Sequence, residues 1–370
     1  MTKRVLILGG YGNFGKRISA ALAAKGIPVL IAGRDVQKAG DLAKSIGANA
    51  SPLQLDIETG LSSALQEHDP CVVVNTVGPF QEQGYDAARI AIEHRVHYID
   101  LADGREFVGG INKLDQKAQD AGVAVISGAS TVPALSDAVV TAYSSEFANI
   151  NLMKYGIAPG QGAERGLATT QAILGYVGRK LAPFKGIRSD IYGWQDIYRQ
   201  PYPGLGKRWM ANCDVPDLDL LPERHNIATI QFSAGLELGV MHLGLWALSH
   251  LVRLGLPLPL ARIAPTLLSI SNWFNPFGSK DGGMHIFLTG ESAADPARQI
   301  ERSWFVVARN GCGPHIPTIP AIILAARIAQ GNVPVTGARP CLGLVSLSDY
   351  LSELEALDIE IITHLRSIAP

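Results

Sequence analysis

The chain has 370 residues, of which 47% are hydrophobic and 18% charged, and its formal net charge is -1. This length allows two folded domains, and this composition excludes an intrinsically disordered chain. The balanced charge and the lack of Lys/Arg runs speak against a nucleic-acid partner. The four cysteines are far apart and form no C-x-x-C pair, so we expect a reduced, cytoplasmic protein with no disulfide framework and no metal site.

Two apolar stretches invite comparison with membrane or targeting segments. Residues 5–8 are followed at once by glycines, and this run is too short for the apolar core of a signal peptide. Residues 236–270 are interrupted by charged residues, histidines and prolines, and they lack the ~20 uninterrupted apolar residues of a spanning helix. We therefore expect no membrane span, and packed helices or an apolar surface in the second stretch.

The first element is an apolar strand, Val5–Leu8, followed by Gly10, Gly12 and Gly15 in a G-x-G-x-x-G spacing. A helix is predicted from about residue 13 to residue 24, and a second strand from residue 29 to residue 32. In such a unit we expect Gly10 to make the tight turn, Gly12 to let a pyrophosphate approach the backbone, and Gly15 to let the helix pack on the strand. The helix N-terminus then faces the phosphates of a dinucleotide.

The end of the second strand bears on which dinucleotide binds. NAD sites usually carry Asp or Glu there, whereas this chain has Gly33 followed by Arg34. A small residue leaves room for a 2′-phosphate, and a guanidinium can bind that phosphate through two hydrogen bonds. We therefore expect NADP rather than NAD, since Asp35 comes one place late for the NAD contact. The alternative is that Arg34 is simply a solvated residue.

Strands and helices alternate six times over residues 1–135, which predicts an α/β fold with a doubly wound parallel sheet, the Rossmann architecture. Ligands of such sheets bind at the carboxyl ends of the strands. The loop after the fourth strand, Val77-Gly78-Pro79, is therefore expected to face the nicotinamide half of the cofactor. Asp56, at the end of the third strand, either borders the adenine pocket or caps the following helix.

After residue 136 the pattern changes to runs of strands with segregated helices, which predicts a second, α+β domain over residues 136–311. We expect this domain to hold the substrate and to form a dimer interface. Its predicted strands lie near residues 152–158, 187–194, 227–232, 284–289 and 302–308, and its helices at 239–254 and 260–274. The tail, residues 312–370, is expected to pack back on the first domain.

The opening residues 9–15, the Val77–Phe80 loop and the His97–Asp100 strand together resemble the saccharopine dehydrogenase-like oxidoreductases. The resemblance implies an NADP-binding Rossmann domain followed by an α+β dimerisation and substrate domain. It places the cofactor on Gly10, Gly12, Asn13, Phe14, Gly15, Arg34, Gly78 and Pro79. We add Tyr11, Asp56 and Val77 to the expected cofactor site because they lie in the same loops at the ends of the predicted strands. Lysine-pathway members carry an Asp-Pro-Gly element after the sixth strand, whereas this chain has residues 129–133, Ala-Ser-Thr-Val-Pro.

Hydride transfer also needs a proton donor or acceptor beside the substrate. The candidates are Asp103, after the fifth strand, and Ser130, after the sixth, although either residue can instead serve the local turns. The sequence therefore predicts a homodimeric NADP-dependent oxidoreductase acting on a C=N, C=O or activated C=C bond. One alternative is a non-catalytic NADP-binding sensor or scaffold. Another is a membrane-associated protein that uses the apolar helices near Trp246 as a surface anchor.

Overall fold

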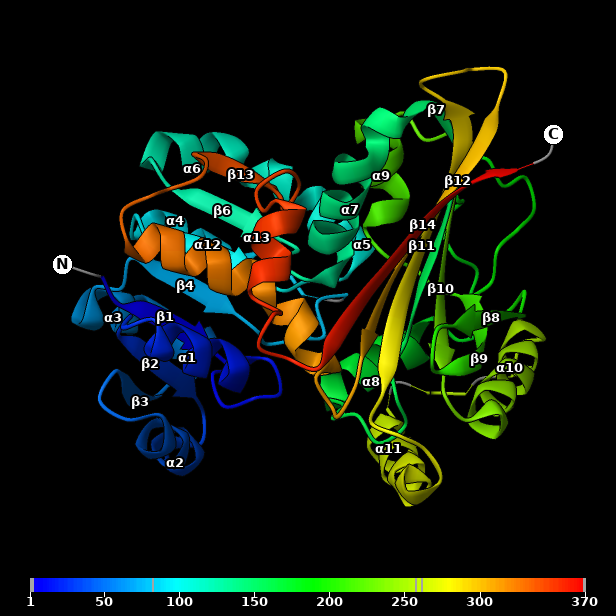
Figure 1. Ribbon diagram of the computed structural model, residues 1–370. Coiled ribbons are helices and arrows are strands. Elements are labelled where there is room, and N and C mark those ends of the chain that lie inside the picture. Colours follow the sequence, from blue (N-terminus) through cyan, green and yellow to red (C-terminus); the bar gives the residue numbers. More distant parts are fainter. Residues whose placement is uncertain (1–2, 82, 257, 261, 369–370) are drawn as a thin grey trace. The chain divides into compact units, whose positions relative to one another are not determined.

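The computed structural model describes residues 3–81, 83–256, 258–260 and 262–368. These residues form two compact units, each built on a seven-stranded sheet (Figure 1). The first unit comprises the described residues up to Ala138 together with His315–Glu353. The second comprises Val139–Pro314 and the described residues from Leu354 onward.

The sheet of the first unit is parallel throughout, with the strand order β13-β6-β5-β4-β1-β2-β3. This is the expected doubly wound α/β sheet. Its strands are β1 (Val5–Leu8), β2 (Val29–Gly33), β3 (Ala50–Gln54), β4 (Val72–Asn75), β5 (His97–Asp100), β6 (Ala124–Ser127) and β13 (Gly337–Pro340). Its helices are α1 (Gly15–Ala24), α2 (Val36–Ile46), α3 (Ile57–His68), α4 (Asp86–Glu93), α5 (Arg105–Gly109), α6 (Asp115–Ala121), α12 (Ile319–Ala329) and α13 (Leu347–Ser352).

The central strands β1 and β4 are buried along their whole length, because apolar side chains on both faces meet covering helices. The chain leaves β1 toward β2 on one side and returns later to place β4 on the other side. The connections after β1 and β4 therefore diverge, and this is the switch point at which open α/β sheets bind their ligands. The glycine turn and the loop after β4 both lie at this point.

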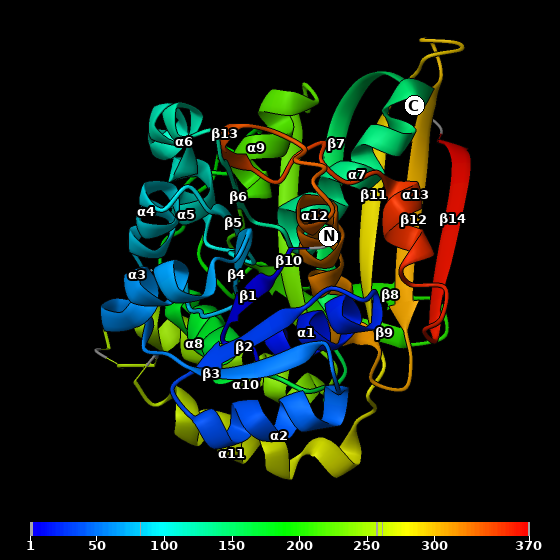
Figure 2. The ribbon, with the colours of Figure 1, turned by 90° about the vertical axis from the view of Figure 1, so that its left-hand side faces the viewer.

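The sheet of the second unit is mixed, with the order β14-β12-β11-β7-β10-β9-β8 and one parallel pair, β7 with β10. Figure 2 shows β11, β12 and β14 lying side by side. The strands are β7 (Phe147–Ala158), β8 (Tyr198–Tyr202), β9 (Gly206–Asn212), β10 (Thr229–Leu236), β11 (Gly282–Ser292), β12 (Gln299–Ala308) and β14 (Ile359–Ile368). The helices are α7 (Ser136–Tyr143), which begins in the first unit, α8 (Leu167–Tyr176), α9 (Asp217–Arg224), α10 (Gly239–Arg253) and α11 (Ala264–Trp273).

Two segments differ from the expectation. Only part of the 312–370 tail lies with the first unit: α12, β13 and α13 do, whereas β14 pairs with all ten residues of β12 in the second sheet. The segment 187–194 forms isolated bridges, Gly193 with Val177 and Tyr192 with Lys180, instead of a strand. One edge of the second sheet is formed instead by β8 and β9, an antiparallel pair in which Tyr202 lies opposite Gly206.

Candidate functional site

The turn after β1 is made by three closely packed glycines. Gly9 carries the positive φ, +70°, so the tight turn that we expected at Gly10 falls one residue earlier. Gly10 is needed for a different reason: its N–H donates to Ala32 O at 3.0 Å, and a β-carbon there would lie 3.0 Å from Ile31 Cγ2. The turn is thus pressed against β2.

Gly15 and Gly12 fit the roles that their spacing indicated. A β-carbon on Gly15 would lie 2.2 Å from Gly9 O, so only glycine lets α1 begin directly against the turn. A β-carbon on Gly12 would meet one described atom within 4 Å, Gly9 O at 3.1 Å, apart from its chain neighbours. The backbone at Gly12 is therefore open on its outer side, beside the positive end of the α1 dipole. This arrangement can hold a pyrophosphate.

The carboxyl end of β2 is covered by an aromatic ring from the glycine turn. A β-carbon on Gly33 would lie 2.3 Å from Tyr11 Cε1, and the Tyr11 hydroxyl accepts a hydrogen bond from Asp35 N at 3.1 Å. The Asp35 carboxylate caps α2 by accepting from Lys38 N. Arg34 is exposed, and it forms no ion pair within the described residues. A cationic side chain, with no acidic residue before it, thus stands where a cofactor ribose would lie.

The loop after β4 is tied to the glycine turn. Thr76 Oγ1 donates to Leu8 O at 2.8 Å, and the Val77 side chain packs against Gly9, where a β-carbon would lie 2.8 Å from Val77 Cγ2. Asn75 Oδ1 accepts from Val77 N at 3.0 Å, and the Gly78-Pro79 peptide that follows is cis. The structure therefore brings this loop beside the glycine turn, at the switch point of the sheet.

The buried carboxylate of Asp100 organises the ends of β5 and β6. Its Oδ1 accepts from Ala102 N at 3.0 Å, Ser127 Oγ at 2.9 Å and Gly128 N at 2.9 Å. Burial raises the pKa of Asp100 to about 6, although these three hydrogen bonds favour the ionised form. Sequence spacing favours Asp103 over Asp100 as a polar contact, because the residues through which Asp100 joins the two strand ends, Ser127 and Gly128, come more than 25 positions later in the chain.

Asp103 and Ser130 lie after β5 and β6, which are neighbouring parallel strands, so both residues stand at the same edge of the sheet. Asp103 Oδ1 accepts from Gln81 Nε2 at 3.0 Å, and burial raises the pKa of Asp103. The Ser130 side chain is 8% exposed, and its N–H donates to Gly128 O at 2.8 Å. A carboxyl group and a hydroxyl group thus stand at the carboxyl ends of β5 and β6.

The remaining predicted cofactor residues serve the local fold as well. Asp56 caps α3 by accepting from Glu58 N at 3.0 Å, which fits the helix-cap alternative. Phe14 occupies the cap position of α1, and Asn13 accepts hydrogen bonds from the Arg17 guanidinium. The tail adds His315, whose pKa is lowered by burial and by the charges of Arg17 and Lys16 on α1. Three hundred residues separate this histidine from the glycine turn in the chain, so sequence spacing alone does not connect them.

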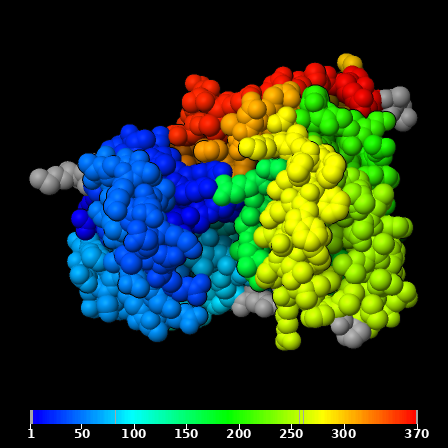
Figure 3. Space-filling model, turned by 90° about the horizontal axis from the view of Figure 1, so that it is seen from below, coloured from blue at the N-terminus to red at the C-terminus, as the bar shows by residue number. Residues whose placement is uncertain are grey.

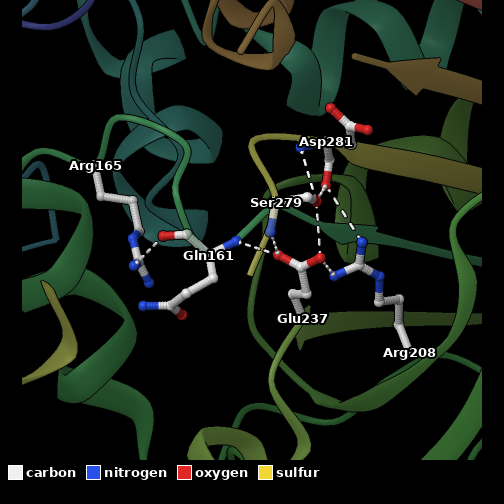
Figure 4. Close-up of polar contacts among 6 residues, drawn as sticks. All are labelled: Gln161, Arg165, Arg208, Glu237, Ser279 and Asp281. Carbon is white, nitrogen blue, oxygen red and sulfur yellow. Dashed lines mark hydrogen bonds and ion pairs between the residues drawn. The ribbon is translucent and has the colours of Figure 1, made fainter. Parts of the chain in front are cut away.

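The second unit contains a separate polar cluster, in which Glu237 joins three loops (Figure 4). Glu237 Oε2 accepts from Gln161 N at 2.7 Å and from Ser279 N at 2.8 Å, while Oε1 accepts from Ser279 Oγ at 2.8 Å. The same Oε1 lies 3.1 Å from Nη1 of Arg208, whose side chain is 4% exposed. Burial alone would raise the pKa of Glu237, but the hydrogen bonds and the Arg208 charge lower it below its ordinary value.

This cluster holds the end of the second sheet together. Arg208 Nη2 donates to Asp281 O at 3.3 Å, and Arg165 Nη2 donates to Gln161 O at 2.6 Å on the far side of the loop. Because every oxygen of Glu237 already accepts hydrogen bonds and its pKa is low, this carboxylate is poorly suited to proton transfer. Its chemistry fits a structural role.

Residues 5–126 match the family model of the saccharopine dehydrogenase NADP-binding domain. Among solved structures, the apo histidine-tagged saccharopine dehydrogenase (L-Glu forming) from Saccharomyces cerevisiae aligns over 99% of this chain and 100% of its own, with 14% identity and a TM-score of 0.67. The amine dehydrogenase from Mycobacterium smegmatis aligns over 92% of this chain and 95% of its own, with 12% identity and a TM-score of 0.48. No curated protein matches the sequence.

Residues 5–126 are therefore similar to the NADP-binding domain of saccharopine dehydrogenases, in agreement with the resemblance and with the NADP prediction. The yeast structure confirms the fold class over the whole chain, since the shared fold includes the second, mixed sheet.

Proposed function

We propose that the protein is an NADP-dependent oxidoreductase that transfers a hydride between NADP(H) and a small molecule with a C=N, C=O or activated C=C bond. The observation that carries this proposal is the end of β2, where Tyr11 covers Gly33 and the exposed Arg34 follows. No carboxylate stands at residue 33 to accept from the ribose hydroxyls, and a guanidinium is available for the 2′-phosphate.

In this proposal the cofactor lies across the carboxyl ends of the strands. The adenosine half contacts Tyr11, Arg34 and the region of Asp56, and the pyrophosphate lies over Gly12 at the start of α1. The nicotinamide half extends toward Val77-Gly78-Pro79, because β4 is the neighbour of β1 on the side away from β2. The ends of β5 and β6 continue in the same direction.

The substrate then lies near the ends of β4 to β6, with Asp103 and Ser130 as the groups that serve it. Burial raises the pKa of Asp103, which increases the fraction of protonated carboxyl and favours a proton donor over a base. Bound NADPH would supply the hydride to one carbon of the substrate double bond. The carboxyl proton would go to the other atom of that bond, which is the nitrogen of C=N, the oxygen of C=O or the second carbon of an activated C=C. The Ser130 hydroxyl orients the same substrate group.

Cofactor titration tests the binding half of the proposal. We expect Arg34→Gln to weaken NADPH binding by about 10- to 100-fold, the loss of a charge-assisted contact, and to leave NADH binding unchanged. Lys38→Gln is the matched control, because it removes a positive charge from the start of the adjacent helix α2. Equal losses for NADPH and NADH, or an equal effect of both variants, would contradict the role of Arg34.

Turnover tests the catalytic half. We expect NADPH consumption with at least one class among imines, ketones and enoyl thioesters, and a lower kcat for Asp103→Asn with unchanged NADPH affinity. Tight NADPH binding without turnover on any class would favour the sensor or scaffold instead. The homodimer and the cytoplasmic location also stay predictions, and light scattering of the purified chain measures the first.

A further inference from the structure

One face of α10 exposes apolar side chains along its whole length. Val240 is 66% exposed, Leu243 37%, Leu251 47% and Leu254 84%. Gly244 and Ala247 lie on the same face and are also exposed. These positions form a single stripe along the outer side of the helix. In an ordinary surface helix, this solvent-facing side carries charged or polar residues.

The other sides of α10 already account for its packing on the sheet. Its partly buried Met241, Leu245, Trp246, Leu248 and Val252 pack against a cluster that includes Ala211 and Leu236. His242 and Ser249 are fully buried. The apolar stripe is thus additional to the residues that the second unit uses for its own core, and burial within the described structure does not explain it.

The apolar surface continues over α11 and the turn that follows. Trp273 is 73% exposed, Phe277 76% and Leu256 47%. Nine of the thirteen exposed large hydrophobic side chains of the described residues lie between residues 240 and 277, so they are concentrated in one surface and not scattered. Figure 3 shows this α10–α11 surface, in yellow-green and yellow, facing the viewer.

The charged residues of the helical segment itself have one sign. The sequence contains no Asp or Glu from residue 238 to residue 280. Arg253, Arg262 and Lys280 are exposed over the same segment. An apolar helical segment whose charged residues are all cationic complements an anionic interface. Exposed Trp side chains favour the boundary between lipid headgroups and acyl chains.

We propose that the α10–α11 surface docks on an anionic lipid bilayer, with Leu243, Leu251 and Trp273 inserted at the headgroup level and the cationic residues facing the headgroups. The helix α10 has 15 residues, and no helix among the described residues is long and apolar enough to cross a membrane. The contact is therefore interfacial. A second copy of the chain is a less suitable occupant, because a two-fold contact would bring together two cationic surfaces without acidic partners.

The Glu237 cluster fixes this surface to the sheet. Glu237 precedes α10, Ser279 follows α11, and their hydrogen bonds tie the two ends of the helical segment together (Figure 4). Gln161 Nε2 donates to Ser271 O, on α11, at 2.8 Å. These hydrogen bonds fix the two ends of the helical segment and one side of α11, while α10 packs on the sheet through its partly buried apolar residues.

Vesicle flotation tests the proposal. We expect the full chain to float with vesicles of phosphatidylcholine containing phosphatidylserine, to bind pure phosphatidylcholine at least tenfold more weakly, and to lose binding at high salt. Leu251→Ser is expected to reduce binding tenfold or more, whereas Leu365→Ser is the matched control, since Leu365 on β14 is 50% exposed. Failure to float with anionic vesicles, or equal loss in both variants, would overturn the proposal.

Two further measurements separate lipid from protein occupants. Trp273→Phe is expected to abolish a blue shift of the intrinsic fluorescence that anionic vesicles induce, because Trp273 at the end of α11 is 73% exposed. Sedimentation without lipid is expected to give the same mass for the wild type and Leu251→Ser. A dimer that Leu251→Ser dissociates would overturn the bilayer proposal and assign the surface to a second copy.

NADPH binding by these variants is expected to be unchanged, which separates this test from that of the cofactor site.

Discussion

The Tyr11 ring occupies the space that a side chain at residue 33 would need, since a β-carbon on Gly33 would lie 2.3 Å from Tyr11 Cε1. The usual route to NAD specificity, an acidic residue at the end of β2, is therefore blocked by a residue of the glycine turn itself. Residues 11 and 33 act as a pair: a large residue at one requires glycine at the other.

This pairing predicts the outcome of an attempted change of cofactor. Gly33→Asp alone is expected to lose NADPH binding by more than about tenfold without gaining NADH, because the new side chain displaces Tyr11. Gly33→Asp combined with Tyr11→Ala is expected to bind NADH more tightly than NADPH. Fluorescence titration of both dinucleotides measures this, with Gly40→Asp as the control, since a β-carbon at Gly40 meets nothing within 4 Å. A preference for NADH in the Gly33→Asp single variant would show that Tyr11 is no obstacle.

The ion pair of Glu237 with Arg208 predicts a strong effect on stability. In Glu237→Gln the amide can keep the hydrogen bonds from Gln161 and Ser279 N–H groups, but its NH₂ group then faces the buried Arg208. A buried cation without its partner costs about 3–5 kcal/mol, so we expect the free energy of unfolding to fall by this order.

Chemical denaturation of the whole chain measures this change. The control is Glu360→Gln, which removes a more exposed partner of Arg309 in the same unit and is expected to cost less than about 1 kcal/mol. Similar losses for the two variants would mean that the Glu237 pair contributes no more than a surface ion pair.

The first unit could be predicted from the sequence because its signals are local. The spacing of Gly10, Gly12 and Gly15 and the apolar strands place the turn and the sheet without knowledge of distant contacts. The contact of Tyr11 with Gly33 depends on how the turn packs on β2, which spacing alone does not determine. Likewise, partners of Asp100 come from the end of β6. The strand β14 pairs with β12, which ends 51 residues before β14 begins. Such pairings depend on tertiary packing rather than on local pattern.

The buried Asp100 predicts a stability difference that changes with pH. Because the pKa of Asp100 is about 6 in the folded chain and the ordinary pKa of an aspartate is 3.8, the folded state holds this proton more tightly than the unfolded state. Below pH ~4 the carboxyl group is protonated in both states, and its favourable contribution is fully present. As the pH rises to ~6, the unfolded state loses the proton first, so the free energy of unfolding falls relative to that of Asp100→Asn. The total change is about 2–3 kcal/mol.

The comparison with Asp100→Asn is needed because other buried groups act in the opposite direction. Burial lowers the pKa of His285 to about 3 and that of His242 to about 4, so these histidines destabilise the chain as the pH falls below ~6.5. Both histidines are present in the wild type and in Asp100→Asn, so their contribution cancels when the two free energies of unfolding are subtracted. Any change in hydrogen bonding by the amide appears as an offset that does not depend on pH. Denaturant unfolding at intervals from pH 4 to pH 7.5 measures the free energy of unfolding of the wild type minus that of Asp100→Asn. If this difference stays constant or rises with pH, the pKa of Asp100 is not raised.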